Sequence, residues 1–105
     1  FGLQIVTING DKSGRVSLIE ALRSIAKRGI NSILVECGGT LCTEFIKSNL
    51  IDEFLVYRAP IVLGGDGIAA VGGFGVTDLS AAPNFKQTGI TRLGADTLES
   101  YRRQI

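Results

Sequence analysis

The sequence predicts an α/β domain with a mostly parallel sheet flanked by helices. Short apolar runs alternate with amphipathic stretches along the first half of the chain, an order typical of parallel strands joined by helical crossovers. The chain has 105 residues, of which 45% are apolar. This composition supplies a hydrophobic core, and the length suits one domain better than two. We therefore treat residues 1–105 as one unit.

The first predicted elements are a strand, a helix and a second strand. The apolar run over residues 3–8 predicts a strand, which ends at a cluster of turn-forming residues. Ser17 and Glu20 have the spacing of a capping box, and apolar residues then recur at helical intervals as far as Gly29. Residues 33–35 form a short apolar run that is typical of a strand buried on both faces.

A second helix and a third strand follow. Thr40 is the predicted N-cap of a helix that ends near Asn49. The apolar residues 54–59 predict a strand that Pro60 stops. Because two helical crossovers precede this strand, the simplest topology makes it parallel to the earlier strands.

The C-terminal part of the chain predicts a long loop and a hairpin. Residues 61–83 hold six of the fourteen glycines, and small domains seldom keep such a long irregular loop without a use. Residues 85–93 and 97–101 are joined by a Gly-Ala-Asp turn. This pattern predicts two antiparallel strands.

Composition excludes several classes of function. Eleven basic against ten acidic residues leave a net charge of +1 without a basic block, so we expect no nucleic-acid partner. The chain has no histidine, which removes imidazole bases and histidine-containing metal sites, and we expect no metal. No apolar run approaches the roughly 20 residues of a membrane span. The five-residue spacing of Cys37 and Cys42 fits neither a redox pair nor a metal knuckle, and it favours a reducing cytoplasm.

The segment from Ile33 to Leu41 carries the clearest signal of a binding site. The predicted strand delivers Glu36 and two glycines directly to the start of a helix. Glycines let a ligand approach the backbone, and the amides of Gly39, Thr40 and Leu41 would face a phosphate at the positive end of the helix dipole.

An ordinary strand-to-helix turn is the alternative interpretation. In that case the glycines only save space, Thr40 only caps the helix, and Glu36 is solvated or paired with an arginine. Residues 65–70 also match a dinucleotide-binding glycine pattern. We attribute that match to chance, because no helical periodicity follows it and no acid lies about 20 residues further on.

Three blocks of sequence resemble a known family when they are taken together. They are residues 35–41 (Val-Glu-Cys-Gly-Gly-Thr-Leu), 50–53 (Leu-Ile-Asp-Glu) and 59–65 (Ala-Pro-Ile-Val-Leu-Gly-Gly). In order and spacing they resemble the C-terminal reductase domain of the bifunctional riboflavin-biosynthesis deaminase/reductase. The resemblance runs from about Ile5 to Tyr101.

This resemblance implies a dihydrofolate-reductase-like fold and a cytoplasmic oxidoreductase of riboflavin biosynthesis. The implied reaction is the NADPH-dependent reduction of 5-amino-6-(5-phosphoribosylamino)uracil, which needs no nucleophile, so we name no catalytic residue. By position, Glu36 would contact the substrate. The implied cofactor-binding residues are Gly38, Gly39, Thr40, Leu41, Cys42, Thr43 and Glu44.

The chain departs from the family in its length. The family's reductase domain is about twice as long, so residues 1–105 are predicted to form the C-terminal portion of a single reductase domain. We expect little or no turnover from this portion alone, and a homodimer that covers its exposed sheet edge. Two alternatives stay open. One is a related reductase of another pteridine or pyrimidine, and the other is a non-catalytic α/β module kept for oligomerisation.

Overall fold

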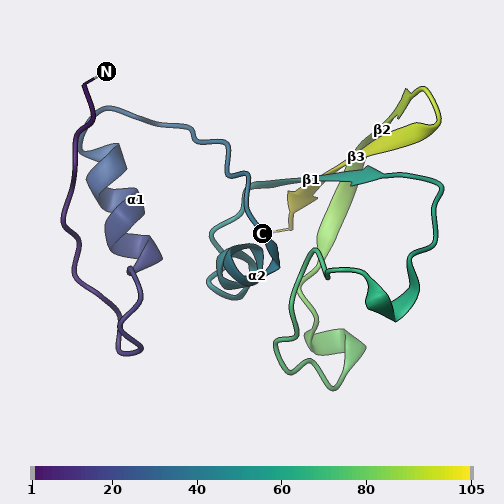
Figure 1. The fold of residues 1–105 in the computed structure, drawn as a ribbon, viewed down its shortest axis with the longest axis horizontal. Helices are drawn as coiled ribbons and strands as arrows, with labels where there is room; N and C mark the ends of the chain where they lie inside the picture. The colour runs from purple at the N-terminus through teal and green to yellow at the C-terminus, as the bar shows by residue number, and fades with distance from the viewer. Residues whose placement is uncertain (1, 105) are drawn as a thin grey trace. The chain divides into compact units, whose positions relative to one another are not determined.

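The computed structural model describes residues 2–104 and confirms the α/β class (Figure 1). Within these residues, two helices accompany one sheet of three strands. The chain divides into two compact units, Phe1–Glu36 and Cys37–Ile105. Neither described helix is long and apolar enough to cross a membrane.

The first unit contains helix α1, Leu18–Ala26, where the sequence predicts it. Ser17 is the N-cap, and its hydroxyl accepts a hydrogen bond from the backbone amide of Glu20 at 3.4 Å. The Glu20 carboxylate pairs instead with Arg23 at 2.8 Å, so this contact takes the place of the reciprocal half of the capping box. Gly29 follows the helix with φ +82°, a conformation that glycine adopts without steric cost.

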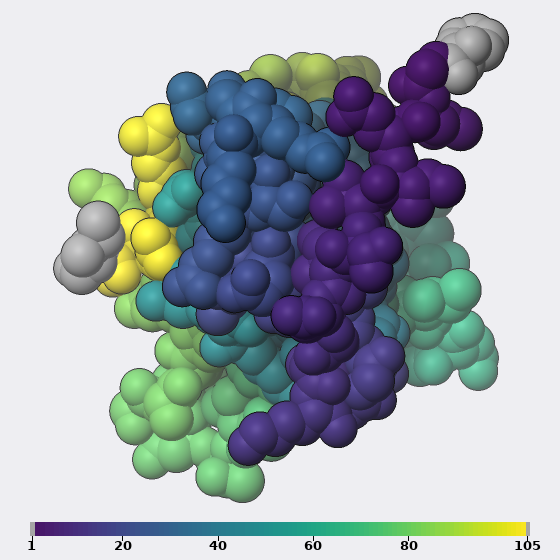
Figure 2. All heavy atoms as spheres, turned by 90° about the vertical axis from the view of Figure 1, so that its left-hand side faces the viewer, coloured from purple at the N-terminus to yellow at the C-terminus, as the bar shows by residue number. Residues whose placement is uncertain are grey.

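The two strands predicted in the first unit are extended segments without strand pairing. Residues 2–9 run beside α1 (Figures 1 and 2), and Arg28 donates a hydrogen bond to Gln4 at 3.1 Å. Residues 33–35 are likewise unpaired. The prediction of strands there is wrong for residues 2–104, because a strand exists only where a neighbour takes its backbone donors and acceptors. The apolar side chains of these segments are consequently exposed, to 94% at Ile5 and 76% at Leu34.

The second unit begins with helix α2, Gly39–Lys47, which starts earlier than predicted. Gly38 is the N-cap, with φ −78° and ψ 174°, and Thr40 lies inside the first turn. Thr40 is therefore not the cap. The helix ends at Lys47, near the predicted position, and Asn49 follows the Ser48 cap with φ 56°. The amides of Asn49 and Leu50 bond back to the carbonyls of Ile46 and Phe45, the pattern of a Schellman motif.

The sheet of the second unit is antiparallel throughout. Strand β1 (Glu53–Arg58) pairs with β3 (Asp96–Arg103), and β3 pairs with β2 (Phe85–Leu93), which gives the order β1-β3-β2. The hairpin of β2 and β3 is confirmed. Gly94, with φ +64°, takes the first position of its two-residue turn.

The parallel arrangement predicted for residues 54–59 is wrong for the described residues. This strand pairs with β3, with Phe54 opposite Tyr101 and Val56 opposite Glu99. The crossover argument assumes that earlier strands are its neighbours, but those segments are unpaired here. The only described sheet partner available to β1 is the C-terminal hairpin, and this fixes the antiparallel direction.

The loop between β1 and β2 is irregular, as predicted. It contains two short 3₁₀ turns, η1 at Gly64–Asp66 and η2 at Leu79–Ala81. No α-helix follows the glycines of η1 within the described loop, which agrees with our rejection of the dinucleotide pattern. The most buried residues of the described chain are Thr43 and Phe45, both on α2.

Candidate functional site

The start of α2 presents backbone donors without a side-chain cap. The first turn contains Gly39, Thr40 and Leu41, whose amides have no acceptor within the helix. Gly38 lacks a side chain that might accept from them, and its own carbonyl receives the first helical bond from Cys42 at 3.0 Å. The first turn carries no acidic residue. Donors and helix dipole therefore favour an anion at this end of the helix.

Thr43 joins this end of the helix to the glycine-rich loop. Its hydroxyl donates to the carbonyl of Gly39 at 2.6 Å and accepts from the amide of Gly72 at 2.7 Å. The residue is buried, and both bonds are shielded from water. Thr43 thus holds the loop against the first turn of α2.

Because Gly39 has no side chain, the glycine-rich loop can pack directly against the first turn of α2. A Cβ atom built on Gly39 would lie 2.5 Å from the carbonyl oxygen of Ala69, closer than non-bonded atoms approach. Ala69 and the neighbouring Ala70 belong to the stretch that imitates a dinucleotide motif. That stretch is consequently part of the surroundings of the α2 start.

The predicted cofactor-binding residues occupy two successive turns of α2 and its cap. Gly38, Gly39, Thr40 and Leu41 form the cap and first turn, where the free donors lie. The others follow in the second turn: Cys42, Thr43 and Glu44. The Glu44 carboxylate lies 3.9 Å from the Lys47 ammonium.

Glu36, the predicted substrate contact, is the last residue of the first unit. Its side chain is exposed. Among residues 2–104 no three acidic, cysteine or histidine side chains gather as a metal site.

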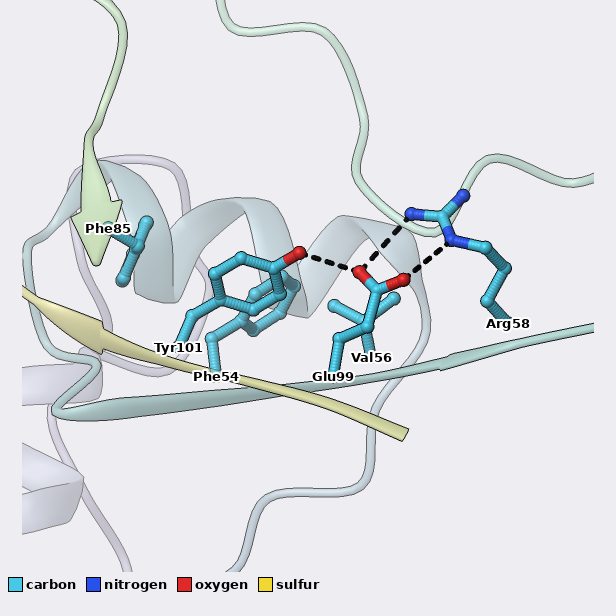
Figure 3. Close-up of a pocket in the computed structure, with 6 residues that line it drawn as sticks. All are labelled: Phe54, Val56, Arg58, Phe85, Glu99 and Tyr101. Carbon is cyan, nitrogen blue, oxygen red and sulfur yellow. Dashed lines mark hydrogen bonds and ion pairs between the residues drawn. The ribbon is translucent and has the colours of Figure 1, made fainter. Parts of the chain in front are cut away.

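A second feature, which the sequence analysis missed, is an open hollow of about 340 Å³ on one face of the sheet (Figure 3). The side chains of Phe54, Val56 and Phe85 provide its apolar part, and those of Arg58, Glu99 and Tyr101 its polar part. The polar residues lie on β1 and β3, whose pairing joins positions about forty residues apart. Glu99 and Tyr101 are two residues apart on one predicted strand, so their side chains lie on the same face of the sheet. This spacing is the signal from which the sequence could have predicted that these two side chains are neighbours.

The polar residues of the hollow form a connected set of hydrogen bonds. Arg58 Nε donates to Glu99 Oε1 at 3.0 Å, and Tyr101 Oη donates to Glu99 Oε2 at 2.6 Å. The bonds from Arg58 and Tyr101 hold the pKa of Glu99 below its ordinary value of 4.5. Conversely, the hydrogen bond to the Glu99 carboxylate raises the pKa of Tyr101.

A Glu99→Gln variant will lower the pKa of Tyr101 towards its ordinary value. The neutral amide accepts the phenol hydrogen bond more weakly and no longer repels the phenolate. We would follow tyrosinate absorbance in a Tyr57→Phe background, so that only Tyr101 reports. Glu44→Gln in the same background is the matched control and will leave the titration unchanged. Equal midpoints for both variants would show that Glu99 does not control Tyr101.

The raised pKa of Tyr101 also has a defined effect on stability. The phenol is held in its neutral form in the folded state, so its contribution is complete below the ordinary pKa of 10.0 and is lost as the pH rises through the raised value. For Glu99 the sign is reversed. Its contribution is complete above pH 4.5 and is lost as the pH falls through the lowered value.

Comparison with known proteins places the chain in a family. Residues 2–98 match the family described as "RibD C-terminal domain". A riboflavin biosynthesis protein RibD from Buchnera aphidicola (subsp. Baizongia pistaciae) is 37% identical over 89 residues, which are 85% of this chain and 24% of that protein. A 5-amino-6-(5-phosphoribosylamino)uracil reductase from Buchnera aphidicola (subsp. Acyrthosiphon pisum) is 28% identical, over 85% of this chain and 43% of its own length.

The fold has solved counterparts as well. A structure of RibD from Acinetobacter baumannii superposes with a TM-score of 0.77 at 25% sequence identity, covering 86% of this chain and 26% of that one. The chain thus spans about a quarter of the length of the RibD proteins that it matches. Because the family match covers nearly all of the described residues, the chain belongs to the RibD C-terminal domain family.

Proposed function

We propose that this chain is part of a reductase of riboflavin biosynthesis that reduces 5-amino-6-(5-phosphoribosylamino)uracil with NADPH. The observation that supports the proposal most directly is the uncapped start of α2, with its free amides and without an acid in its first turn. A helix start of this kind suits a phosphate group, and the family match supports a protein that uses it in this way. The relative named as a reductase of the same pyrimidine supports the choice of substrate.

The residues of α2 fit the phosphate groups of NADPH. The amides of Gly39, Thr40 and Leu41 would donate to phosphate oxygens, and the Thr40 hydroxyl would add a donor. Gly38 allows close approach because it has no side chain. Thr43, whose hydroxyl is engaged with Gly39 and Gly72, keeps the loop in place beside these donors. It is a positioning residue in this proposal.

Reduction requires little covalent chemistry from the protein. NADPH, when bound, supplies a hydride to the ribosyl carbon of the substrate, which becomes a ribityl chain. The protein's part is to bind and orient both molecules. In the proposal Glu36 contacts the substrate, and its exposed carboxylate is available for hydrogen bonds to hydroxyl or amino groups. A cytoplasmic location and a homodimer belong to the same proposal.

A calorimetric titration tests the proposal without depending on turnover. NADPH will bind to the chain at low ionic strength, and added salt will weaken the binding because phosphate contacts are screened. With NADPH present, the phosphoribosylaminopyrimidine will bind and dihydrofolate will not.

Other outcomes would contradict the proposal in distinct ways. Binding of dihydrofolate in preference to the phosphoribosylaminopyrimidine would favour a related reductase of another pteridine. A folded chain that binds no NADPH at low salt would favour the non-catalytic module, in which the glycine turn is purely structural.

A further inference from the structure

Cys37 and Cys42 flank the first turn of α2. Because Gly38 is the N-cap, Cys37 immediately precedes the cap and Cys42 is the fourth residue of the helix. Side chains at these two positions commonly pack against each other, as in the hydrophobic staple. Both cysteines are free, Cys37 exposed and Cys42 half-buried. The five-residue spacing did not predict a redox pair, but the helix start places these two positions beside each other around its cap.

The Cys37 side chain also affects the ionisation of Cys42. Burial raises the pKa of the Cys42 thiol, and the charge and hydrogen-bonding contact of the Cys37 side chain raise it further. Effects of this kind act between near neighbours. They agree with the packing expected from the two positions around the cap.

We propose that Cys37 and Cys42 are a redox modification site, at which an intrachain disulfide bond forms reversibly across the first turn of α2. The oxidant is a small-molecule disulfide such as oxidised glutathione. The exposed Cys37, as its thiolate, attacks one sulfur of the oxidant, forms a mixed disulfide and releases one glutathione thiolate. The Cys42 thiolate then attacks the Cys37 sulfur and releases the second glutathione.

The exchange balances in atoms and electrons. The two cysteine thiols lose two protons and two electrons as the sulfur–sulfur bond forms. The sulfur–sulfur bond of the oxidant breaks, and its two halves leave as thiols. Because every step is thiol–disulfide exchange, an excess of reduced glutathione or dithiothreitol reverses it.

The disulfide bond encloses the residues that bind phosphate in the proposed function. The closed ring runs from Cys37 to Cys42 and includes Gly38, Gly39 and Thr40. Its formation draws the sulfur atoms from packing distance to about 2 Å, and the backbone between them must adjust. This consequence rests on the proposed function, and we expect the oxidised chain to bind NADPH severalfold more weakly than the reduced chain.

Thiol counting by mass spectrometry tests the modification independently of cofactor binding. The chain is equilibrated in glutathione buffers of increasing oxidised fraction, and remaining thiols are alkylated. The parent chain will lose two hydrogen atoms, take up no alkyl group and run as a monomer on a non-reducing gel. Dithiothreitol will restore both thiols.

Single-cysteine variants provide the matched controls. Cys37→Ser and Cys42→Ser each retain one thiol and will accumulate a glutathione adduct, because no second thiol is present to displace it. The modification proposal is overturned if the parent chain stays fully alkylated or carries two adducts, or if it forms disulfide bonds between chains. If the reduced chain does not bind NADPH, the proposed function is contradicted. The thiol counts then still test the formation of the disulfide bond, because they do not depend on NADPH.

Discussion

A Gly38→Asp variant will remain folded and will lose most of its affinity for NADPH. Aspartate is a favoured N-cap residue, so the change stabilises α2 by a few tenths of a kcal/mol. No described atom lies within 4 Å of a Cβ built at this position, and the backbone can accept the side chain. Its carboxylate, however, takes the amides that phosphate would use and repels the phosphate charge. Repulsion of about 1 to 4 kcal/mol corresponds to a loss of about fivefold to several hundredfold.

Gly38→Asn separates charge from shape. Asparagine has nearly the same size and caps a helix equally well, but it carries no charge. Calorimetry should therefore show NADPH affinity in the order parent, Asn variant, Asp variant, with the gap between the two variants shrinking at high salt. Equal NADPH affinities of the Asp and Asn variants would show that no phosphate group of NADPH binds at this end of α2.

A Gly39→Ala variant will be destabilised although alanine is the better helix former. The new Cβ would meet the Ala69 carbonyl oxygen at 2.5 Å, and a backbone atom cannot simply rotate away. The loop must move, and the bond from the Gly72 amide to Thr43 is strained with it. Overpacking of this kind costs about 1 to 3 kcal/mol, which exceeds the gain of up to about 1 kcal/mol from helix propensity.

Gly38→Asn is the matched control for this prediction, because its Cβ meets no atom within 4 Å outside the neighbouring residues and asparagine is a good N-cap residue. Urea denaturation should show a lower free energy of unfolding for the Gly39→Ala variant, and a value within about 0.5 kcal/mol of the parent for Gly38→Asn. Amide exchange at Gly72 should also become faster only in the Gly39 variant. If the Gly39→Ala variant and the parent chain have identical stability and identical exchange at Gly72, the glycine-rich loop does not pack against Gly39.

The contact at Gly39 also determines where a charge should be introduced. Any side chain at Gly39 would displace the loop, so a lost affinity there would report sterics as well as charge. Gly38 is open and lies one residue away. From the sequence alone, the two adjacent glycines are equally suitable positions for an introduced charge. The contact of Gly39 with Ala69 distinguishes them.

Local signals account for the elements that were predicted correctly. Ser17 caps α1 because its hydroxyl reaches an amide three residues away, and Asn49 ends α2 because its backbone tolerates positive φ. The hairpin follows from Gly94, which meets the needs of a two-residue turn. Each of these features depends on neighbours within a few residues, and so it can be read from sequence.

The predictions of strands and of strand direction were wrong where the pairing neighbour lies far away in the sequence. Residues 33–35 have the composition of a buried strand, yet no partner pairs with them in the described chain. Residues 54–59 form a strand as predicted, but the hairpin gives it an antiparallel neighbour. The set of Arg58, Glu99 and Tyr101 depends on the same pairing, so its members could not be brought together from local pattern alone.

The sequence by itself determined where both helices and the hairpin lie, and that a glycine turn leads into the start of a helix. It also carried the three blocks that indicate the family. The tertiary structure decided the direction of the strand at residues 54–59 and the contact of Thr43 and Gly39 with the glycine-rich loop. Capping and turn preferences act over a few residues, whereas strand pairing and loop packing join residues that only the folded chain brings into contact.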